Sequence, residues 1–263
     1  VLALARATST DLPRATEIAG AALRGFNLPA SEMGRVSDVL TATANKSAQT
    51  LEDLFEAFKP VAPIAAEAGE SMEDVAAAIG ILANNGIKGS LAGNALARAY
   101  KNLSSSAAQD ELRKFGVEAV DASGNLRPLA DIINDLAKAT QGLGTAERLS
   151  IFETLFGRGQ AAALKLASSG TAFDTLRDEI RDAAGLAVQT AEQMDAGIGG
   201  AFRKLLSAVE GVAIAIGEAI EGPVRKVADA LASVAGYVTR LVNQNRELVA
   251  TIGTCEYQVE RLD

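Results

Sequence analysis

The sequence contains no histidine and no tryptophan, and its single cysteine is Cys255. Without histidine, the Ser-His-Asp and Cys-His arrangements of nucleophilic catalysis cannot be assembled, and most catalytic zinc sites lose their usual ligand. One cysteine cannot form a disulfide within the chain, which is compatible with a reducing compartment. We therefore expect Cys255 to be inert and expect no catalytic residue of these classes.

Basic and aromatic residues are also scarce. Lys and Arg together number 25 against 33 Asp and Glu, which gives a net charge of −8, and no run of basic residues occurs. An acidic chain repels phosphate backbones, so sequence-specific nucleic-acid binding is not expected. Hydrophobic residues make up 48% of the chain, but only 8 Phe and 3 Tyr are among them. We expect a core built from close contacts between alanine-rich helices.

No complete motif for a cofactor or a metal ion is present. The segment from Gly80 to Ser90 lacks the Gly-Lys-Ser/Thr order of a phosphate-binding loop, and the segment that begins at Gly142 lacks the last glycine of a dinucleotide-binding loop. Five residues from Asp121 are similar to the start of a calcium loop, but no glutamate follows at the EF-hand position. We predict a turn there and assign no cofactor-binding and no metal-ligating residue.

Two groups of carboxylates are the best candidates for general acid–base chemistry. One contains Glu67, Glu70, Glu73 and Asp74, and the other lies within residues 178–182. Paired carboxylates can hydrolyse glycosidic bonds, but neither group is flanked by the aromatic residues of a sugar site. We interpret both as helix caps and solvated helix faces, and we predict no catalytic residue and no enzymatic activity.

What the sequence has in abundance is helical periodicity, and the clearest instance is the stretch 71–103. Ser71 is a suitable N-cap with Asp74 placed to complete a capping box, and an Asn-Asn-Gly sequence can end the first helix. We expect Ser90 to cap the second helix, which carries Leu91 on its apolar side. Because the facing positions are mostly Ala and Gly, we predict that the two helices form a tight hairpin.

The rest of the chain up to about residue 185 predicts further helices. These are expected at residues 1–6, 13–25, 33–46, 51–69, 107–115, 129–139, 146–157, 160–170 and 171–184, with Thr145 as a cap. Pro60 and Pro63 are expected to kink or split the helix that Thr50 caps. Alternating apolar and polar residues at 117–127 predict one small β-hairpin, which must pack on helices to be stable.

The pattern changes after residue 185, because loop signals become rare. We expect long helices, which rise about 1.5 Å per residue, in a rod-like segment over 186–263. The run Leu205–Ile220 is apolar, but it holds two glutamates and only 16 residues, fewer than the ~20 that cross a bilayer. We favour a helix packed against copies of itself, and transient membrane contact stays open.

These observations predict a mainly α fold. A compact helical domain over 1–185, with one small β-hairpin at 117–127, precedes long extended helices over 186–263. The chain begins at Val1 rather than at Met, so we expect a fragment of a longer protein, and its first residues have no features of a secretory signal peptide.

Several motifs resemble those of phage tail tape measure proteins, in the core region shared by a large family of long-tailed phages and prophages. The helical pair carries the order Leu-Ala-x-x-Gly-Ile-Lys-Gly-Ser-x-Ala-Gly-x-Ala-Leu at residues 82–96. The preceding SEMGRVSDVLTATANKSAQTLEDLFEAFKPVAPIA is similar to the family's preceding segment. Later segments with the same likeness are FGVEAVDASGNLRPLADIINDLA, AERLSIFETLFGRGQAAALKLA and GAFRKLLSAVEGVAIAIGEAI. The resemblance extends over about residues 8–222.

This resemblance implies a structural protein in the lumen of a phage tail tube, which sets tail length and takes part in tail assembly and genome delivery. It implies tail tube and tail tip proteins, tail assembly chaperones and further copies of the chain as partners, and the host cytoplasm as the place of assembly. From the residues alone, two other interpretations stay open. One is a membrane-active helical protein, pore-forming or toxin-like, and the other is a cell-wall hydrolase that uses an acidic cluster.

Overall fold

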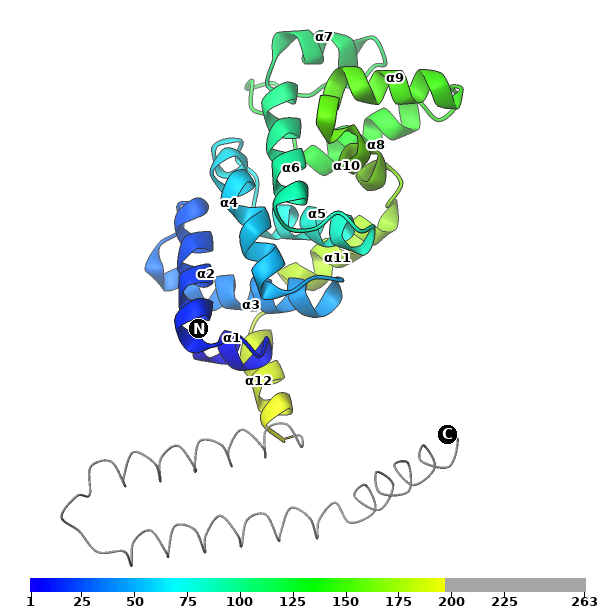
Figure 1. Ribbon diagram of the computed structural model, residues 1–263. Coiled ribbons are helices and arrows are strands. Elements are labelled where there is room, and N and C mark those ends of the chain that lie inside the picture. The colour runs from blue at the N-terminus through cyan, green and yellow to red at the C-terminus, as the bar shows by residue number, and fades with distance from the viewer. Residues whose placement is uncertain (197–263) are drawn as a thin grey trace, which may run out of the picture. The chain divides into compact units, whose positions relative to one another are not determined.

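The computed structural model describes residues 1–196, and residues 197–263 lie outside the described part of the chain. Helices dominate the described residues, and no β-strand occurs among them, which confirms the mainly α character (Figure 1). The helical elements are α1 (Leu2–Ala7), α2 (Leu12–Gly25), η1 (Ala30–Glu32), α3 (Met33–Lys46), α4 (Leu51–Glu67), α5 (Met72–Asn84), α6 (Gly89–Leu103), α7 (Ser106–Arg113), α8 (Leu129–Ala139), α9 (Thr145–Phe156), η2 (Gly157–Gly159), α10 (Gln160–Ala167), α11 (Thr171–Arg181) and α12 (Leu186–Ala196).

Local capping explains where the early helices begin. Asp11 accepts a hydrogen bond from the backbone N–H of Arg14 at the start of α2. Thr50 and Asp53 form a complete capping box on α4, with bonds of 3.0 and 3.1 Å between each side chain and the other residue's N–H. Caps of this kind contribute about 1 kcal/mol each, and they confirm the starts predicted for these two helices.

Two other expected caps are wrong. Ser90 and Thr145 lie inside the first turns of α6 and α9, whose N-cap residues are Lys88 and Gly144 without a side-chain cap. In both cases the helix begins one or two residues earlier than the expected cap would require. Ser90 and Thr145 therefore lie within the first helical turn. Their hydroxyl groups are not at the N-cap position, from which a side chain accepts the first free N–H groups of the helix.

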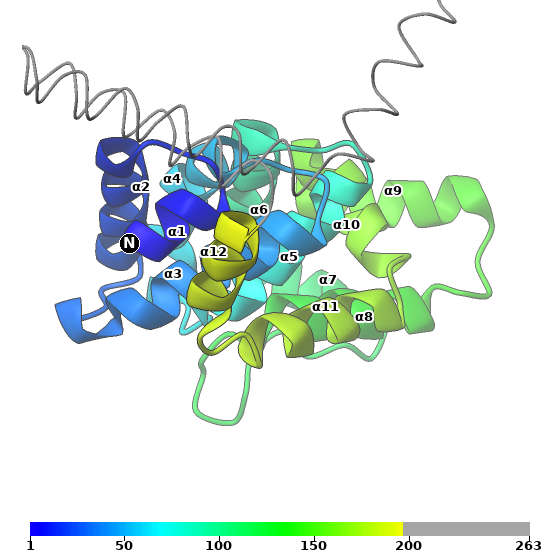
Figure 2. The same cartoon turned by 90° about the horizontal axis from the view of Figure 1, so that it is seen from below.

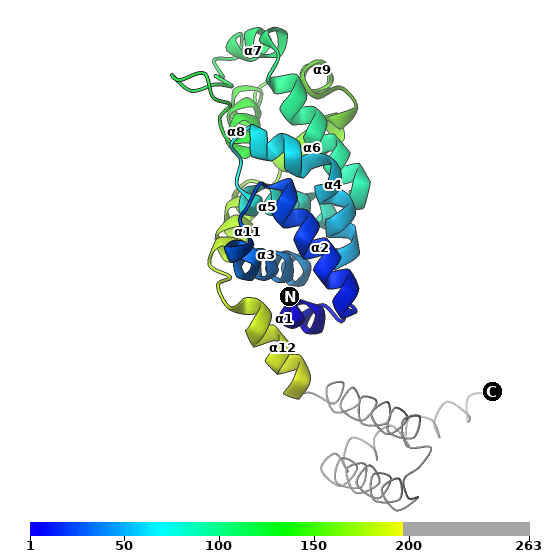
Figure 3. The same cartoon turned by 90° about the vertical axis from the view of Figure 1, so that its left-hand side faces the viewer.

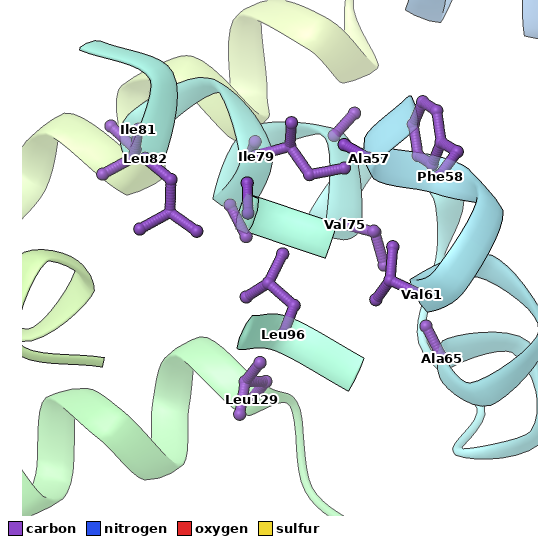
Figure 4. Close-up of a cluster of buried hydrophobic side chains, with 14 of the residues drawn as sticks. Ala57, Phe58, Val61, Ala65, Val75, Ile79, Ile81, Leu82, Leu96 and Leu129 are labelled. Atoms are coloured by element: carbon purple, nitrogen blue, oxygen red, sulfur yellow. The ribbon is translucent and has the colours of Figure 1, made fainter. Parts of the chain in front are cut away.

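Helix α5 lies at the centre of the compact unit. Every residue from Val75 to Ala83 is buried, and α3, α4, α10 and α11 all pack against this helix. Figure 4 shows Val75, Ile79 and Leu82 of α5 among side chains from α4, α6 and α8. A helix that is apolar on every side is stable in water only when its neighbours cover every side. The stretch singled out by its periodicity is thus the core of the fold.

The closest helix contact joins α6 to α4, which lie side by side in Figures 1 and 3. A Cβ atom at Gly93 would lie only 2.0 Å from the carbonyl oxygen of Ala57 and 2.8 Å from Cγ of Pro60. Helix α6 packs much less on α5 than on α4. The tight hairpin predicted within 71–103 is therefore wrong, because the small residues of α6 face α4. Leu91, expected on the apolar side of α6, is 71% exposed.

Helix α4 continues through both of its prolines, so it is not split there, and the alternative of a kink stays a prediction. Pro60 and Pro63 each remove one backbone hydrogen bond, to the carbonyl groups of Glu56 and Lys59 respectively. Buried side chains before and after the prolines pack against α2 and α6. Tertiary packing therefore outweighs the low helix propensity of proline at these positions.

The β-hairpin predicted at 117–127 does not form a pair of strands. Among the described residues, the β-type pairing consists of one isolated antiparallel bridge between Val120 and Leu126. Between them, Asp121 Oδ1 accepts hydrogen bonds of 2.8 and 2.9 Å from two backbone N–H groups of the same loop. The side chain closes a compact turn, and the segments flanking it are too short to add a ladder of strand hydrogen bonds.

Residues Val1–Ala191 form one compact unit, and a second unit follows it. Helix α12 begins in the first unit, where Figure 2 shows it beside α3. The expected boundary near residue 185 and the rod-like segment over 186–263 stay predictions. The apolar run Leu205–Ile220 and Cys255 lie outside the described residues.

Candidate functional site

The acidic residues near the start of α5 are the first place to look for chemistry. Glu73 is 7% exposed and pairs with Arg35 of α3. The same guanidinium donates to Glu32 at 2.7 Å. An arginine shared by two carboxylates fixes the positions of both. Glu73 therefore anchors α5 to α3.

Asp74 connects α5 to α11. Its two oxygens accept hydrogen bonds of 2.9 Å from the guanidinium of Arg181, and a nitrogen of Arg177 lies 3.9 Å away. Asp74 also accepts a hydrogen bond from the hydroxyl of Ser71, whose oxygen accepts the Asp74 backbone N–H at 3.1 Å. The predicted N-cap of α5 is confirmed, and the carboxylate at its third position is held by a helix from the far end of the unit.

Glu70 connects the start of α5 to α8. Its carboxylate accepts a hydrogen bond of 3.1 Å from the backbone N–H of Leu129, the first residue of α8. Pro128, which precedes this helix, has no polar side chain, so Glu70 supplies a cap from another part of the chain. Burial raises the pKa of Glu70 above its usual 4.5, although the bond from Leu129 opposes this. Burial and the charge of Glu70 also raise the pKa of Tyr100 well above 10.0.

These three carboxylates reach toward three different helices, so they do not form a pair that faces one substrate. Of the four acidic residues in this group, Glu67 alone lines a wide groove on the described part of the chain, with a volume of about 680 Å³. That groove is also lined by Ile64, Tyr100 and Asn125. A single exposed carboxylate in an open groove lacks the partner that general acid–base catalysis needs.

The second acidic group lies on the surface of α11 and in the loop that follows it. Asp178, Glu179 and Asp182 are all exposed. Asp178 lies 3.3 Å from Arg177, and Glu179 lies 3.3 Å from Lys46. Exposed ion pairs of this kind contribute about 0–1 kcal/mol, so this group is a solvated face, as the sequence indicates.

The loops considered as ligand sites have other partners. Within residues 1–196, no group of three or more His, Cys, Asp or Glu side chains is placed to hold a metal ion. At Asp121, hydrogen bonds from Asn125 and other residues of its own turn lower the pKa of the carboxyl group. A Cβ atom at Gly89, in the segment compared with a phosphate-binding loop, would lie 3.7 Å from Cβ of Glu56 and 4.0 Å from Oδ1 of Asp53. Acidic side chains this close to the loop disfavour a bound phosphate.

Sequence reasoning does not find the residues that bind Glu70, Glu73 and Asp74. Arg35, Leu129 and Arg181 are separated from their carboxylate partners by 38, 59 and 107 residues. No local pattern links residues so far apart, and each could equally face solvent on its own helix.

None of the helices within residues 1–196 combines the length and the apolar character required to cross a bilayer.

The segment that carries the family motif contains the residues with the most demanding geometry. Gly86 and Gly89 adopt φ values of +83° and +55°, which L side chains rarely adopt, and Gly93 lies against the backbone of α4. A family model described as phage-related minor tail protein matches residues 1–157, from α1 to the end of α9. The chain belongs to this family.

Two curated relatives of this minor tail protein cover most of its length. It is 35% identical over 239 residues to the tape measure protein of Pneumococcus phage Dp-1, a match that covers 89% of this chain and 21% of the relative. It is 31% identical over 238 residues to the probable tape measure protein of Escherichia phage P2, covering 87% of this chain and 29% of the relative. The chain thus spans less than a third of either relative. No solved structure matches it.

Proposed function

We propose that this chain is part of a tail tape measure protein, a structural protein that sets tail length and takes part in tail assembly and genome delivery. The observation that carries the proposal is that the two relatives matching 89% and 87% of the chain are named tape measure protein and probable tape measure protein. The order of motifs along the chain, with the helical pair at 71–103 in the middle, supports the same assignment.

The geometry favours a structural role over an enzymatic one. The buried or half-buried acids in and just before the first turn of α5 bind arginines and backbone groups of neighbouring helices, which makes them parts of the scaffold. In this proposal residues 1–185 form a compact head and residues 186–263 begin a rod. The partners are the tail tube, the tail tip, assembly chaperones and further copies of the chain. The chain is assembled in the host cytoplasm and ends in the lumen of the virion tail.

The test is a change of residue number in the parent protein. Removing 20 residues from a helical segment that follows this chain should shorten the tail by about 30 Å, because a helix rises about 1.5 Å per residue. Inserting 20 helical residues at the same place should lengthen it by the same amount. Tail lengths are measured by electron microscopy of purified particles.

The matched control replaces the same 20 residues with an unrelated helical sequence of equal length, and this variant should have tails of unchanged length. Tails of unchanged length in the deletion and insertion variants, with normal assembly, would contradict the ruler function. Altered length in the equal-length control would show that sequence rather than length matters, which would also contradict it.

A further inference from the structure

Helix α12 has no capping residue of its own. Gly185 precedes it with φ +79°, a conformation that disfavours any side chain, and glycine offers no acceptor atom. The N–H groups at the start of a helix need acceptors from elsewhere. The N–H of Leu186 finds one locally, since it donates to the carbonyl oxygen of Ala183 at 2.9 Å.

The missing acceptor comes from α3. The two carboxylate oxygens of Asp38 accept the backbone N–H groups of Gly185 and Ala187, each at 2.9 Å. The residues are separated by 147 and 149 positions in the chain. A carboxylate at a helix N-terminus is also favoured by the helix dipole. Asp38 thus caps a helix that lies almost at the other end of the described chain.

Few other contacts hold this junction. The methyl groups of Ala187 and Ala191 are buried, at 2% and 5% exposure, while Val188 is 53% exposed. Small side chains bury little apolar area. A hydrogen bond of 3.5 Å between Asn45 and Thr190 adds a weak contact. The two bonds to Asp38 are shorter than the Asn45–Thr190 bond, and each has a charged acceptor, which makes them strong directional interactions at the start of α12.

We propose that Asp38 is a positioning residue, which fixes the first turn of α12 on α3 at the C-terminal end of the compact unit. This inference rests on the proposed tape measure function for its importance, because a ruler is accurate only if its first residue has a fixed place. A carboxylate gives direction as well as strength, since both oxygens are used and each N–H must point at one of them.

The test uses the full 263-residue chain and measures amide hydrogen exchange by NMR. In Asp38→Ala, exchange at the N–H groups of Gly185 and Ala187 should accelerate about tenfold or more, because hydrogen bonds to charged groups are among the strongest in proteins. Exchange in α5 should change little. Asp38→Asn retains one acceptor oxygen and should give a smaller acceleration. Glu179→Gln removes the exposed ion pair with Lys46 and is the matched control.

A distance measurement separates positioning from general stability. With Cys255 replaced by Ser, spin labels are attached to cysteines introduced at Gly34, which has open space around it, and at Val188. With Asp38 present, the distance between the labels at positions 34 and 188 should have one narrow distribution, and the Glu179→Gln control should give the same result. Asp38→Ala should broaden this distribution, and Asp38→Asn should give an intermediate width. If Asp38→Ala fails to fold, the Asp38→Asn result decides.

A narrow distribution and unchanged exchange in both Asp38 variants would overturn the proposal, as would equal acceleration of exchange throughout the unit. These outcomes are independent of tail length in the parent protein. Suppose that the distance distribution broadens in Asp38→Ala but that tail length does not depend on residue number. Asp38 would then remain a positioning residue, and the proposed tape measure function would be contradicted.

Discussion

At the scale of single residues, two glycines allow neighbouring backbone segments to pack closely against α6. Gly93 faces the backbone of α4 at Ala57, and a Cβ atom at Gly159 would lie 3.1 Å from the carbonyl oxygen of Ala95 in α6. The helix is thus contacted by backbone on two sides. A chain with 3 Tyr, 8 Phe and no Trp gains stability from such close packing, because dispersion contacts increase as backbones approach.

Gly93→Ala tests the contact between α4 and α6. The new methyl group would lie 2.0 Å from the Ala57 carbonyl oxygen, so the helices must separate, and the free energy of unfolding should fall by about 3 kcal/mol or more. Urea unfolding followed by circular dichroism measures the loss. Gly34→Ala is the matched control, since nothing lies within 4 Å of that position and helix propensity predicts a gain of up to about 1 kcal/mol. Equal stability of Gly93→Ala and wild type would contradict the close contact.

Glu70→Gln tests the buried carboxylate. Because burial raises the pKa of Glu70 above 4.5 in the fold, the folded state binds more protons than the unfolded state between the two values. Its contribution to stability is complete below pH 4.5 and is lost as the pH rises through the raised pKa. Glutamine keeps an oxygen that can accept the N–H of Leu129 and does not ionise. The unfolding free energy of the variant, relative to wild type, should therefore increase from acidic to neutral pH.

The measurement is a series of urea titrations at fixed ionic strength across that pH range. Glu67→Gln, at an exposed position three residues earlier, controls for the loss of one negative charge. A difference between Glu70→Gln and wild type that stays constant or falls with increasing pH would show that the Glu70 carboxylate is not held in a desolvated site.

At the scale of elements, the side-chain caps of this unit are of two kinds, local and remote. Helices α2, α4 and α5 carry their own acceptors at Asp11, Thr50 and Ser71. Helices α8 and α12 receive theirs from Glu70 and Asp38, far away in sequence. Local caps let a helix form early, whereas remote caps are complete only when the chain has folded. The remote caps therefore couple late elements to the central ones.

Replacing each proline of α4 by alanine tests what the two missing backbone hydrogen bonds cost. Pro63→Ala restores a donor for the carbonyl group of Lys59 at an exposed position, and we expect a gain of about 1–2 kcal/mol after the loss of unfolded-state restriction is subtracted. Pro60→Ala should gain less or nothing, because the ring of Pro60 packs beside Gly93 of α6. Thermal unfolding measures both. A larger gain for Pro60→Ala would show that its ring adds nothing to the α4–α6 contact.

At the scale of the whole molecule, residues Val1–Ala191 form one unit around a buried helix. Helix α5 packs on helices from before and after it in the sequence, and the acids in and just before its first turn bind α3, α8 and α11. The tape measure proposal needs such a unit to be a stable head at a defined place in a much longer protein. The hydrogen bonds and ion pairs that join the start of the central helix to three other helices would give the unit this stability.

Truncation tests whether this unit is self-sufficient. A chain ending at Ala191 contains the whole compact unit, and it should unfold in one cooperative transition. A chain ending at Ala184 lacks the two N–H groups capped by Asp38 and the buried methyl group of Ala187. We expect its thermal midpoint to be lower by several degrees. A non-cooperative transition in the longer chain would contradict the unit's independence.

The sequence by itself determined the mainly α fold, the positions of nearly all helices up to residue 181, the caps at Thr50 and Ser71, and the resemblance to the tape measure family. These features are encoded by residues within a few positions of one another, where spacing and capping chemistry act directly. The absence of histidine likewise settles which catalytic classes are excluded without reference to any contact.

Only the tertiary structure decided which helices touch. The small residues of α6 identify a close contact but not its partner, which is α4 at Ala57. The alternation at 117–127 predicts strands, yet the carboxylate of Asp121 closes a compact turn and only one isolated bridge forms within the described residues. Whether an acid such as Asp38 faces water or caps a helix 147 residues away depends on where the folded chain places it, and no local pattern carries that information.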